Sequence, residues 1–339
     1  MLHLESITQH VGAETHIHPL DLTLATGAIN VLLGATLAGK TSLLRLMAGL
    51  DRPSAGRVWA GERDVTGVSV RKRNIAMVYQ QFINYPSLSV YENIASPLKL
   101  QRRSAVQIKQ RVGEIAEMLR LTPYLDRHPA ELSGGQQQRT ALARALAKDA
   151  ELLLLDEPLV NLDYKLREEL RRELTQLLNT RNTTVVYATT EPREALQLGG
   201  YTAILAKGRL LQFGATLDVF RRPASLSAAQ AFSDPPLNLL AALNQSPHSA
   251  ATHVGVRAHQ IFIARQRHDD IEIAGQVELA EISGSETYLH VSRANDSLVA
   301  HLPGVHEFAI GEPCSLYINP ADLYGFDAQG TTVFAPKAS

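Results

Sequence analysis

A glycine-bounded loop followed by lysine and threonine is the segment of this 339-residue sequence with the clearest chemical purpose. It lies between an apolar run and a helical pattern, and it comprises Gly34, Ala35, Thr36, Leu37, Ala38, Gly39, Lys40, Thr41 and Ser42. In such loops backbone N–H groups and a helix N-terminus face phosphates, and the threonine hydroxyl can bind magnesium. A plain turn is the alternative interpretation, but Lys40 and Thr41 both stand where the phosphate-binding pattern requires them.

Two carboxylates end an apolar run further along the chain. The residues from Leu152 to Leu155 are followed directly by Asp156 and Glu157. Asp156 can support a magnesium shell, and Glu157 can orient or deprotonate an attacking water. A buried strand that ends in acids is by itself more often structural. Together with the phosphate-binding loop, however, it favours a nucleotide-phosphate site that holds Mg²⁺ and activates a water.

A serine and two glycines precede another helical pattern between these two motifs. The stretch consists of Ser133, Gly134, Gly135 and Gln136, and it again offers a hydroxyl and backbone N–H groups to an anion. In this chain order the three motifs together resemble the ABC transporter ATPases. The resemblance implies that this signature loop closes over ATP held by the opposite subunit of a head-to-tail pair.

Further segments extend the resemblance over nearly the whole chain. Gln80 resembles the family's glutamine loop, which touches magnesium and responds to the membrane partner, and Asp163 resembles the loop that crosses the dimer interface. Residues 85–94 resemble the segment that receives a coupling helix of the permease in carbohydrate importers related to the maltose system. Residues 255–259 and 281–290 resemble the oligonucleotide-binding-type (OB-type) barrel of those ATPases, which serves regulation and dimer contacts. A plain role in stability and dimerisation is equally compatible with this barrel.

Three positions depart from the family pattern. The resemblance implies an aromatic that stacks on adenine at Val11, a glycine at Leu37, and a histidine near the γ-phosphate at Thr190. A threonine hydroxyl can hydrogen-bond, but it cannot carry a proton as an imidazolium does. Local compensation, such as stacking by His10, is one interpretation. The other is an unequal pair, because all three departures belong to the half-site that grips this chain's own ATP; we then expect a heterodimer with a complete second ATPase.

Two histidines and a single cysteine carry weaker signals. His16 and His18 share one face of a possible strand, which could suggest a metal site, but no other ligands are obvious nearby. We therefore expect both to be ordinary surface or packing residues. Cys314 is the only cysteine, so it permits no internal disulfide, and it fits a reducing compartment and a core position.

The elements that must position these residues follow an α/β pattern in the first two thirds of the chain. Apolar runs predict buried parallel strands at 29–34, 152–155 and 184–188, and helical spacing is found at 39–48, 104–121 and 141–147. A hairpin is expected at 202–213, around Lys207 and Gly208. After residue 253, short β-rich segments predict a small barrel, at 255–256, 261–264, 275–279, 288–291, 298–302 and 314–318.

We therefore expect an α/β, P-loop ABC-type nucleotide-binding domain followed by a small OB-type β-barrel. The proline pair after Asp234 and the polar stretch at 245–249 place the boundary, giving domains at 1–235 and 236–339. A mainly helical subdomain is expected at about 85–150 within the first domain.

Charge and hydrophobicity exclude several other classes of protein. The 33 Lys and Arg residues against 34 Asp and Glu residues give a net charge of -1, so no basic field exists to hold nucleic acid. No apolar stretch approaches the roughly 18 residues that span a bilayer, and no secretory signal is visible. A soluble ABC protein in nucleic-acid or ribosome work is disfavoured, because the chain carries one motor and an importer-like barrel.

The resemblance implies the ATP-binding subunit of an importer for a sugar, polyol or related compound, with glycerol or glycerol phosphate as the narrower suggestion. We expect the chain to lie peripherally on the cytoplasmic face of the inner membrane. Its expected partners are transmembrane permease subunits, a second ATPase subunit and, indirectly, an extracytoplasmic solute-binding protein. A non-hydrolysing nucleotide-binding regulatory subunit is the alternative.

Overall fold

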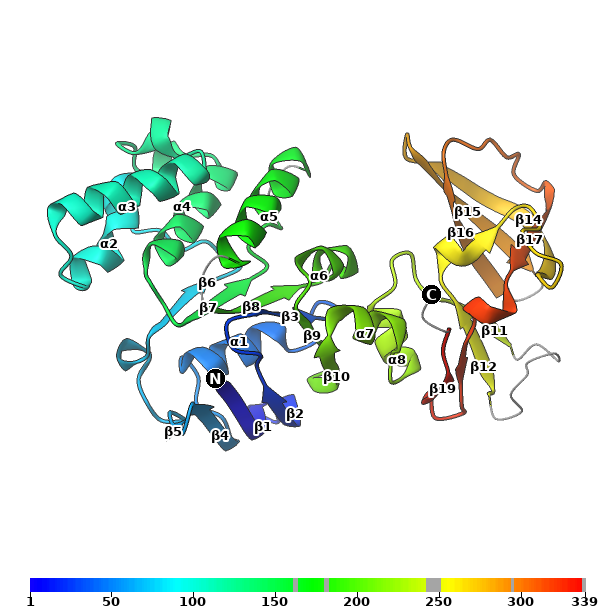
Figure 1. Ribbon diagram of the computed structural model, residues 1–339, viewed down its shortest axis with the longest axis horizontal. Helices are drawn as coiled ribbons and strands as arrows, with labels where there is room; N and C mark the ends of the chain where they lie inside the picture. Colours follow the sequence, from blue (N-terminus) through cyan, green and yellow to red (C-terminus); the bar gives the residue numbers. More distant parts are fainter. Residues whose placement is uncertain (161–163, 180–182, 242–250, 294–295, 337–339) are drawn as a thin grey trace. The chain divides into compact units, whose positions relative to one another are not determined.

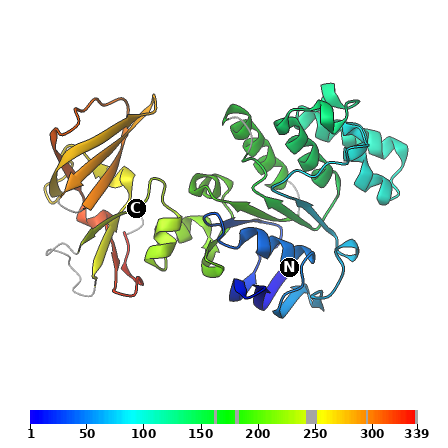
Figure 2. The same ribbon diagram turned by 180° about the vertical axis from the view of Figure 1, so that it is seen from behind.

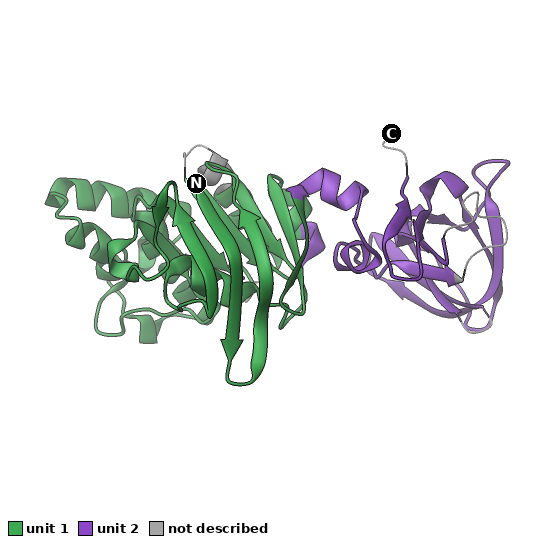
Figure 3. Cartoon of the chain, turned by 90° about the horizontal axis from the view of Figure 1, so that it is seen from below, with its two compact units in different colours: residues 1–190, 194–213 green, residues 191–193, 214–339 purple. Residues whose placement is uncertain are grey.

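In a computed structural model the chain forms two compact units (Figure 3). The structure describes residues 1–160, 164–179, 183–241, 251–293 and 296–336. The first unit holds residues 1–190 and 194–213, and the second holds residues 191–193 and 214–339.

A six-stranded, mainly parallel sheet forms the centre of the first unit. Its strand order is β10-β9-β3-β8-β7-β6, and β3 pairs in parallel with both β8 and β9. β3, β7 and β8 are buried along their whole length, which explains their continuous apolar sequences. The strands are β3 (Ile29–Leu33), β6 (Ile75–Val78), β7 (Leu152–Asp156), β8 (Thr184–Thr189), β9 (Tyr201–Ala206) and β10 (Arg209–Ala215).

A four-stranded antiparallel sheet, in the order β2-β1-β4-β5, forms a second layer of this unit. Helix α1 (Lys40–Ala48) contacts β2 as well as β7 and β8, so it lies between the two sheets, and Leu43, Met47, Ile17 and Leu154 share one core there. Figures 1 and 2 both show α5 (Tyr164–Asn179) and α6 (Pro192–Leu198) on the other side of the six-stranded sheet. The antiparallel strands are β1 (Leu2–Val11), β2 (Glu14–Thr23), β4 (Ala55–Ala60) and β5 (Arg63–Asp64).

Three helices pack together beside β6 in the middle of the chain. They are α2 (Val90–Leu100), α3 (Ala105–Met118) and α4 (Gly134–Ala147), and a serine capping box begins each one. The helix expected from Ala141 starts earlier, because Ser133 accepts a hydrogen bond from the Gln136 N–H and fixes the glycine pair in the first turn. The limits of 85–150 for a helical subdomain stay a prediction.

The second unit is built around a five-stranded antiparallel sheet in the order β13-β17-β14-β15-β16. Its edge strands β13 and β16 contact each other, so the sheet nearly closes into a barrel around apolar side chains such as Leu289, Leu298 and Leu316. The strands are β13 (Ile261–Phe262), β14 (Ile271–Ile282), β15 (Glu286–Arg293), β16 (Asp296–Pro303) and β17 (Pro313–Ile318). This architecture agrees with the predicted fold class.

A smaller sheet and two short helices complete the second unit. The sheet runs in the order β11-β12-β18-β19, with strands β11 (Asn238–Ala241), β12 (His253–Val256), β18 (Tyr324–Phe326) and β19 (Thr332–Phe334). The helices α7 (Thr216–Arg221) and α8 (Leu226–Ala231) also belong here, because Arg257 donates hydrogen bonds to the carbonyl oxygens of Phe220 and Phe232. The contacts therefore divide the chain after residue 213, earlier than the expected boundary at 235/236, which stays a prediction for the functional domains.

Candidate nucleotide site

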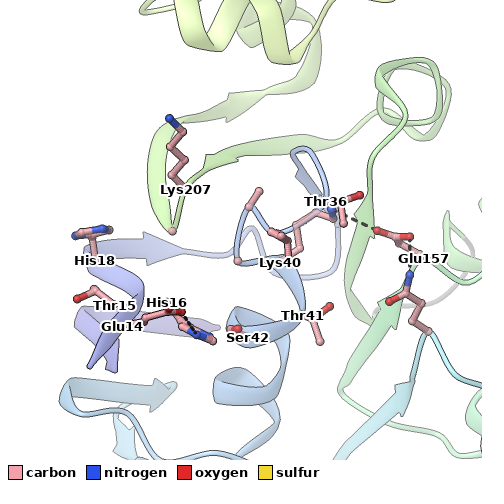
Figure 4. Close-up of a pocket in the computed structure, with 15 residues that line it drawn as sticks. Glu14, Thr15, His16, His18, Thr36, Lys40, Thr41, Ser42, Glu157 and Lys207 are labelled. Atoms are coloured by element: carbon pink, nitrogen blue, oxygen red, sulfur yellow. Dashed lines mark hydrogen bonds and ion pairs between the residues drawn. The ribbon is translucent and has the colours of Figure 1, made fainter. Parts of the chain in front are cut away.

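A cavity of about 640 Å³ opens beside the loop between β3 and α1 (Figure 4). Segments far apart in the sequence meet there, and the predicted residues on its wall are Thr36, Leu37, Ala38, Gly39, Lys40, Thr41, Ser42, Gln80 and Glu157. Gly34 and Ala35 form the start of the same loop and present their carbonyl oxygens to Lys40. The fold thus brings the loop, the glutamine and one of the two acids to one place.

Lys40 and Glu157 form a nearly buried ion pair. The Lys40 Nζ lies 3.3 Å from Glu157 Oε1 and donates to the Gly34 and Ala35 carbonyl oxygens at 2.8 and 3.1 Å. The side chains are only 5% and 14% exposed. Gln80 Nε2 donates to the other oxygen of Glu157, Oε2, at 3.2 Å. The cation and the predicted base therefore touch, and Gln80 helps to orient the carboxylate.

Thr41 and Asp156 form a second polar pair under the loop. The Thr41 hydroxyl donates to Asp156 Oδ2 at 2.8 Å, and Asp156 is 1% exposed. Burial raises the pKa of the Asp156 carboxyl, although the Thr41 hydrogen bond works in the opposite direction. Its second oxygen, Oδ1, is buried without a hydrogen-bond partner among the described residues. An unpaired carboxylate oxygen beside a hydroxyl is a donor set that suits a hard divalent cation.

The backbone of the site holds two side chains in the left-handed region. Leu37 has φ 66° and its side chain is 94% exposed, so it adds conformational strain while its side chain stays in solvent. Glu157 has φ 47° directly after β7. Strained positions of this kind are common where a fold must aim a functional group. The strain at Leu37 follows from a leucine at the position where the resemblance implies glycine.

Several predicted residues lie away from the cavity wall. Of the described residues, Val11 stands at the end of β1 with 52% of its surface exposed, and Thr190 directly follows β8; neither lines the cavity. The signature residues Ser133, Gly134, Gly135 and Gln136 begin α4 and do not line it either. Asp163 lies outside the described residues.

The wall also contains residues that sequence reasoning did not assign to a site: Glu14, Thr15, His16, His18, Lys207 and Gly208. Their signals were weak, because His16 and His18 form only a short alternation and Lys207-Gly208 resembles any hairpin turn. The expectation that both histidines are ordinary surface or packing residues stays a prediction, since lining a cavity does not contradict it. No group of three or more His, Cys, Asp or Glu side chains suited to a metal ion occurs within the described ranges.

Comparison with known proteins decides the family. An ABC transporter family model matches residues 17–160, and a TOBE domain model matches residues 254–326. The sn-glycerol-3-phosphate import ATP-binding protein UgpC of Pectobacterium atrosepticum is 35% identical over 350 residues, covering 97% of this chain and 98% of the relative. The chain belongs to the ABC transporter family of ATP-binding proteins. The α-glucoside transport ATP-binding protein AglK of Rhizobium meliloti is 33% identical to this ABC ATPase over 354 residues, covering 96% and 97% of the two chains.

A solved structure agrees with this membership. The dimeric ATP-binding cassette MJ0796, bound to ADP and Pi, matches the ABC ATPase with a TM-score of 0.59 and 29% identity, covering 64% of this chain and 99% of the cassette. The family resemblance and its activity, ATP hydrolysis coupled to import, are confirmed by these relatives and family models. In the part of the chain that the structure describes, no helix has the length and apolar character needed to cross a membrane.

Proposed function

We propose that this ABC ATPase is the ATP-binding subunit of an importer for a sugar, a polyol or a phosphorylated relative such as glycerol 3-phosphate. The contact of Lys40 with Glu157, next to Thr41 and Asp156, carries the catalytic part of the proposal. The import part is supported by relatives named for sn-glycerol-3-phosphate and α-glucoside transport, each of which is covered almost completely by this chain.

Five polar residues in or beside the cavity have distinct roles in hydrolysis. Lys40 and the loop N–H groups hold the phosphates, and Glu157 accepts the proton of the attacking water while Gln80 keeps its carboxylate oriented. Thr41, Asp156 and the side-chain oxygen of Gln80 would hold Mg²⁺, which supplies charge neutralisation of the phosphate oxygens when bound. The unpaired Oδ1 of Asp156 supports this assignment.

Substitution of the loop lysine tests the nucleotide site. Lys40→Ala is expected to weaken ATP binding at least tenfold without unfolding the protein, because the ATP phosphates lose their ion pair and charge-assisted hydrogen bonds with the Lys40 ammonium group. Titration of ATP gives the affinity and a thermal melt gives the stability. A folded variant that binds ATP as tightly as the wild type would overturn the site.

The membrane partner is a permease that docks on residues 80–94, which places the chain peripherally on the cytoplasmic face of the inner membrane. Ile83 and Tyr85 support this, because they are 52% and 47% exposed despite their apolar character. Ser87→Cys offers an exposed cross-linking position, whereas Ser89 caps α2 and is better left intact. The expected adduct is with a permease subunit of the assembled complex, and its absence would contradict this docking surface. An extracytoplasmic solute-binding protein takes part only through the permease.

The second ATPase of the complex is a different chain in our proposal. The altered positions Val11, Leu37 and Thr190 belong to the half-site for this chain's own ATP, whereas Ser133 and Gly135, which serve the partner's ATP, keep the family pattern. A homodimer would carry the altered half-site twice. A heterodimer carries it once and retains one competent site, which this chain completes with its signature loop.

Glutamine substitution in each subunit separates these possibilities. Glu157→Gln in this chain is expected to spare most of the ATP hydrolysis of the complex, while the equivalent change in the partner removes it, because the loss of a general base lowers the rate about a hundredfold or more. A purified homodimer that hydrolyses ATP at the full rate of the complex would refute the unequal pair. If Glu157→Gln in this chain changes neither the ATP hydrolysis of the complex nor this chain's ATP binding, the non-hydrolysing regulatory alternative is favoured.

A further inference from the structure

The position where an aromatic ring was expected supplies none to the cavity. Val11 pairs with Glu14 at the β1–β2 turn and is not part of the cavity wall. The neighbouring His10 is exposed, and its Nδ1 lies 3.1 Å from the Thr15 Oγ1 on the same hairpin. His10, like Val11, is absent from the described wall, and the compensation suggested for it from the sequence stays an interpretation.

β2 instead brings two imidazole rings to the wall. His16 and His18 alternate with Ile17, which is fully buried in the core, so both histidines face away from the core and line the cavity (Figure 4). His16 keeps a side-chain exposure of 40%, and its Nε2 lies 3.7 Å from a carboxylate oxygen of Glu14. A substantial part of the His16 side chain is therefore accessible in a residue that lines the cavity.

Backbone contacts fix β2 against the phosphate-binding loop. The N–H of His18 donates to the Gly208 carbonyl at 2.8 Å, and the N–H of Gly208 donates to the Ala38 carbonyl at 3.0 Å. A Cβ on Gly208 would stand 2.3 Å from the His16 carbonyl oxygen, and a Cβ on Gly39 would stand 3.3 Å from that same oxygen. His16 is thus the imidazole-bearing residue whose backbone directly borders the loop.

We propose that His16 is the platform on which the base of the bound nucleotide stacks, in place of the aromatic missing at Val11. This inference rests on the proposed nucleotide function of the cavity. Phosphates held at Lys40 and Thr41 occupy one end of the cavity, and the rest of the nucleotide extends along a wall that β2 provides. A flat imidazole ring offers the base a π-face, which an isopropyl group does not.

Nucleotide titration on the full chain tests the role of His16. His16→Ala is expected to weaken ATP binding by about 5- to 150-fold, the range that corresponds to one stacked base. Inorganic tripolyphosphate, which has no base, is expected to bind within twofold of the wild type. His16→Phe keeps a ring and is expected to restore ATP affinity, and His18→Ala, the matched control on the same wall, is expected to change it less than His16→Ala.

The outcomes distinguish the two proposals. If the wild type binds neither ATP nor tripolyphosphate, the nucleotide function itself fails. If both bind and His16→Ala leaves ATP affinity unchanged, or His18→Ala lowers it more, the role of His16 is wrong. A His16→Ala variant that loses tripolyphosphate binding as well has damaged the phosphate-binding loop. His16→Gln, which keeps a polar side chain of similar length, is then tested instead of His16→Ala. If His16→Gln weakens the binding of ATP and of tripolyphosphate equally, the proposal is also overturned.

Discussion

The guanidinium of Arg144 donates a hydrogen bond to the carbonyl oxygen of Ile83 at 2.5 Å and lies 4.6 Å from the centre of the Tyr85 ring. Between them, Asn84 Nδ2 donates to the Gln137 carbonyl at 2.8 Å. Arg144 and Gln137 both belong to α4, the helix that Ser133 caps. The segment proposed to receive the permease is therefore tied to the helix that begins with the signature motif.

Arg144→Met is expected to loosen this tie while leaving ATP affinity within about twofold, because Arg144 does not line the cavity. The Ile83 carbonyl loses a charge-assisted bond, and the free energy of unfolding should fall by about 2 kcal/mol. Urea unfolding measures this. Arg127→Met is the matched control, since Arg127 also lies over a tyrosine ring, Tyr124 at 5.1 Å, but is exposed. Equal effects of the two variants would contradict the tie.

Asp156→Asn is expected to stabilise the magnesium-free protein at pH 7 and to weaken Mg²⁺ binding by roughly tenfold or more. The reason is that burial raises the pKa of the Asp156 carboxyl, so the native state disfavours its ionised form. In the wild type, the ionised Asp156 carboxylate lowers the free energy of unfolding at pH values above its pKa in the folded protein. This cost disappears as the pH falls below the pKa of the same carboxyl in the unfolded protein, which is near 4. Melts of both proteins should therefore converge in acid; a gain that is the same at every pH would exclude ionisation as its cause.

Leu37→Gly is expected to raise the free energy of unfolding by up to about 1 kcal/mol, because glycine adopts a positive φ without the steric cost that leucine has. The gain is limited because glycine also has more conformational freedom in the unfolded chain. Leu37 is 94% exposed, so little packing is lost. Thermal unfolding provides the comparison. Leu37→Val supplies the opposite case, since a β-branched side chain tolerates this φ least. Higher stability of the valine variant would show that the strain argument is wrong.

Arg257→Met is expected to cost about 3 kcal/mol or more in the second unit. The side chain is 3% exposed, and its guanidinium donates to the carbonyl oxygens of Phe220 and Phe232 at 2.7 and 2.8 Å while lying 3.8 Å from the Phe220 ring centre. Removal leaves buried acceptors without a donor. Urea unfolding of the full chain, with proteolysis of residues 214–339 as a local readout, measures the loss. Arg265→Met, at an exposed pair with Glu272, should change stability by less than about 1 kcal/mol.

The sequence by itself determined the parts of the site whose chemistry is contiguous. The loop from Gly34 to Ser42 needs only its own backbone and the following helix to face phosphates, so its pattern predicts its role. Strands β3, β7 and β8 could also be predicted from the sequence, because strands that are buried on both faces must be apolar throughout. Asp156 and Glu157 follow directly from such a strand.

Only the tertiary structure decided which distant residues share the cavity. The approach of Gln80 to Glu157, and the place of His16 and Lys207 on the wall, depend on how β2, β6, β7 and the β9–β10 turn are stacked. The antiparallel sheet of β1, β2, β4 and β5 was not predicted as a whole, because its strands alternate buried and exposed residues with register shifts that blur the pattern. A sequence pattern predicts which face of a helix or strand is buried. Which other element packs against that face depends on the packing of the whole fold.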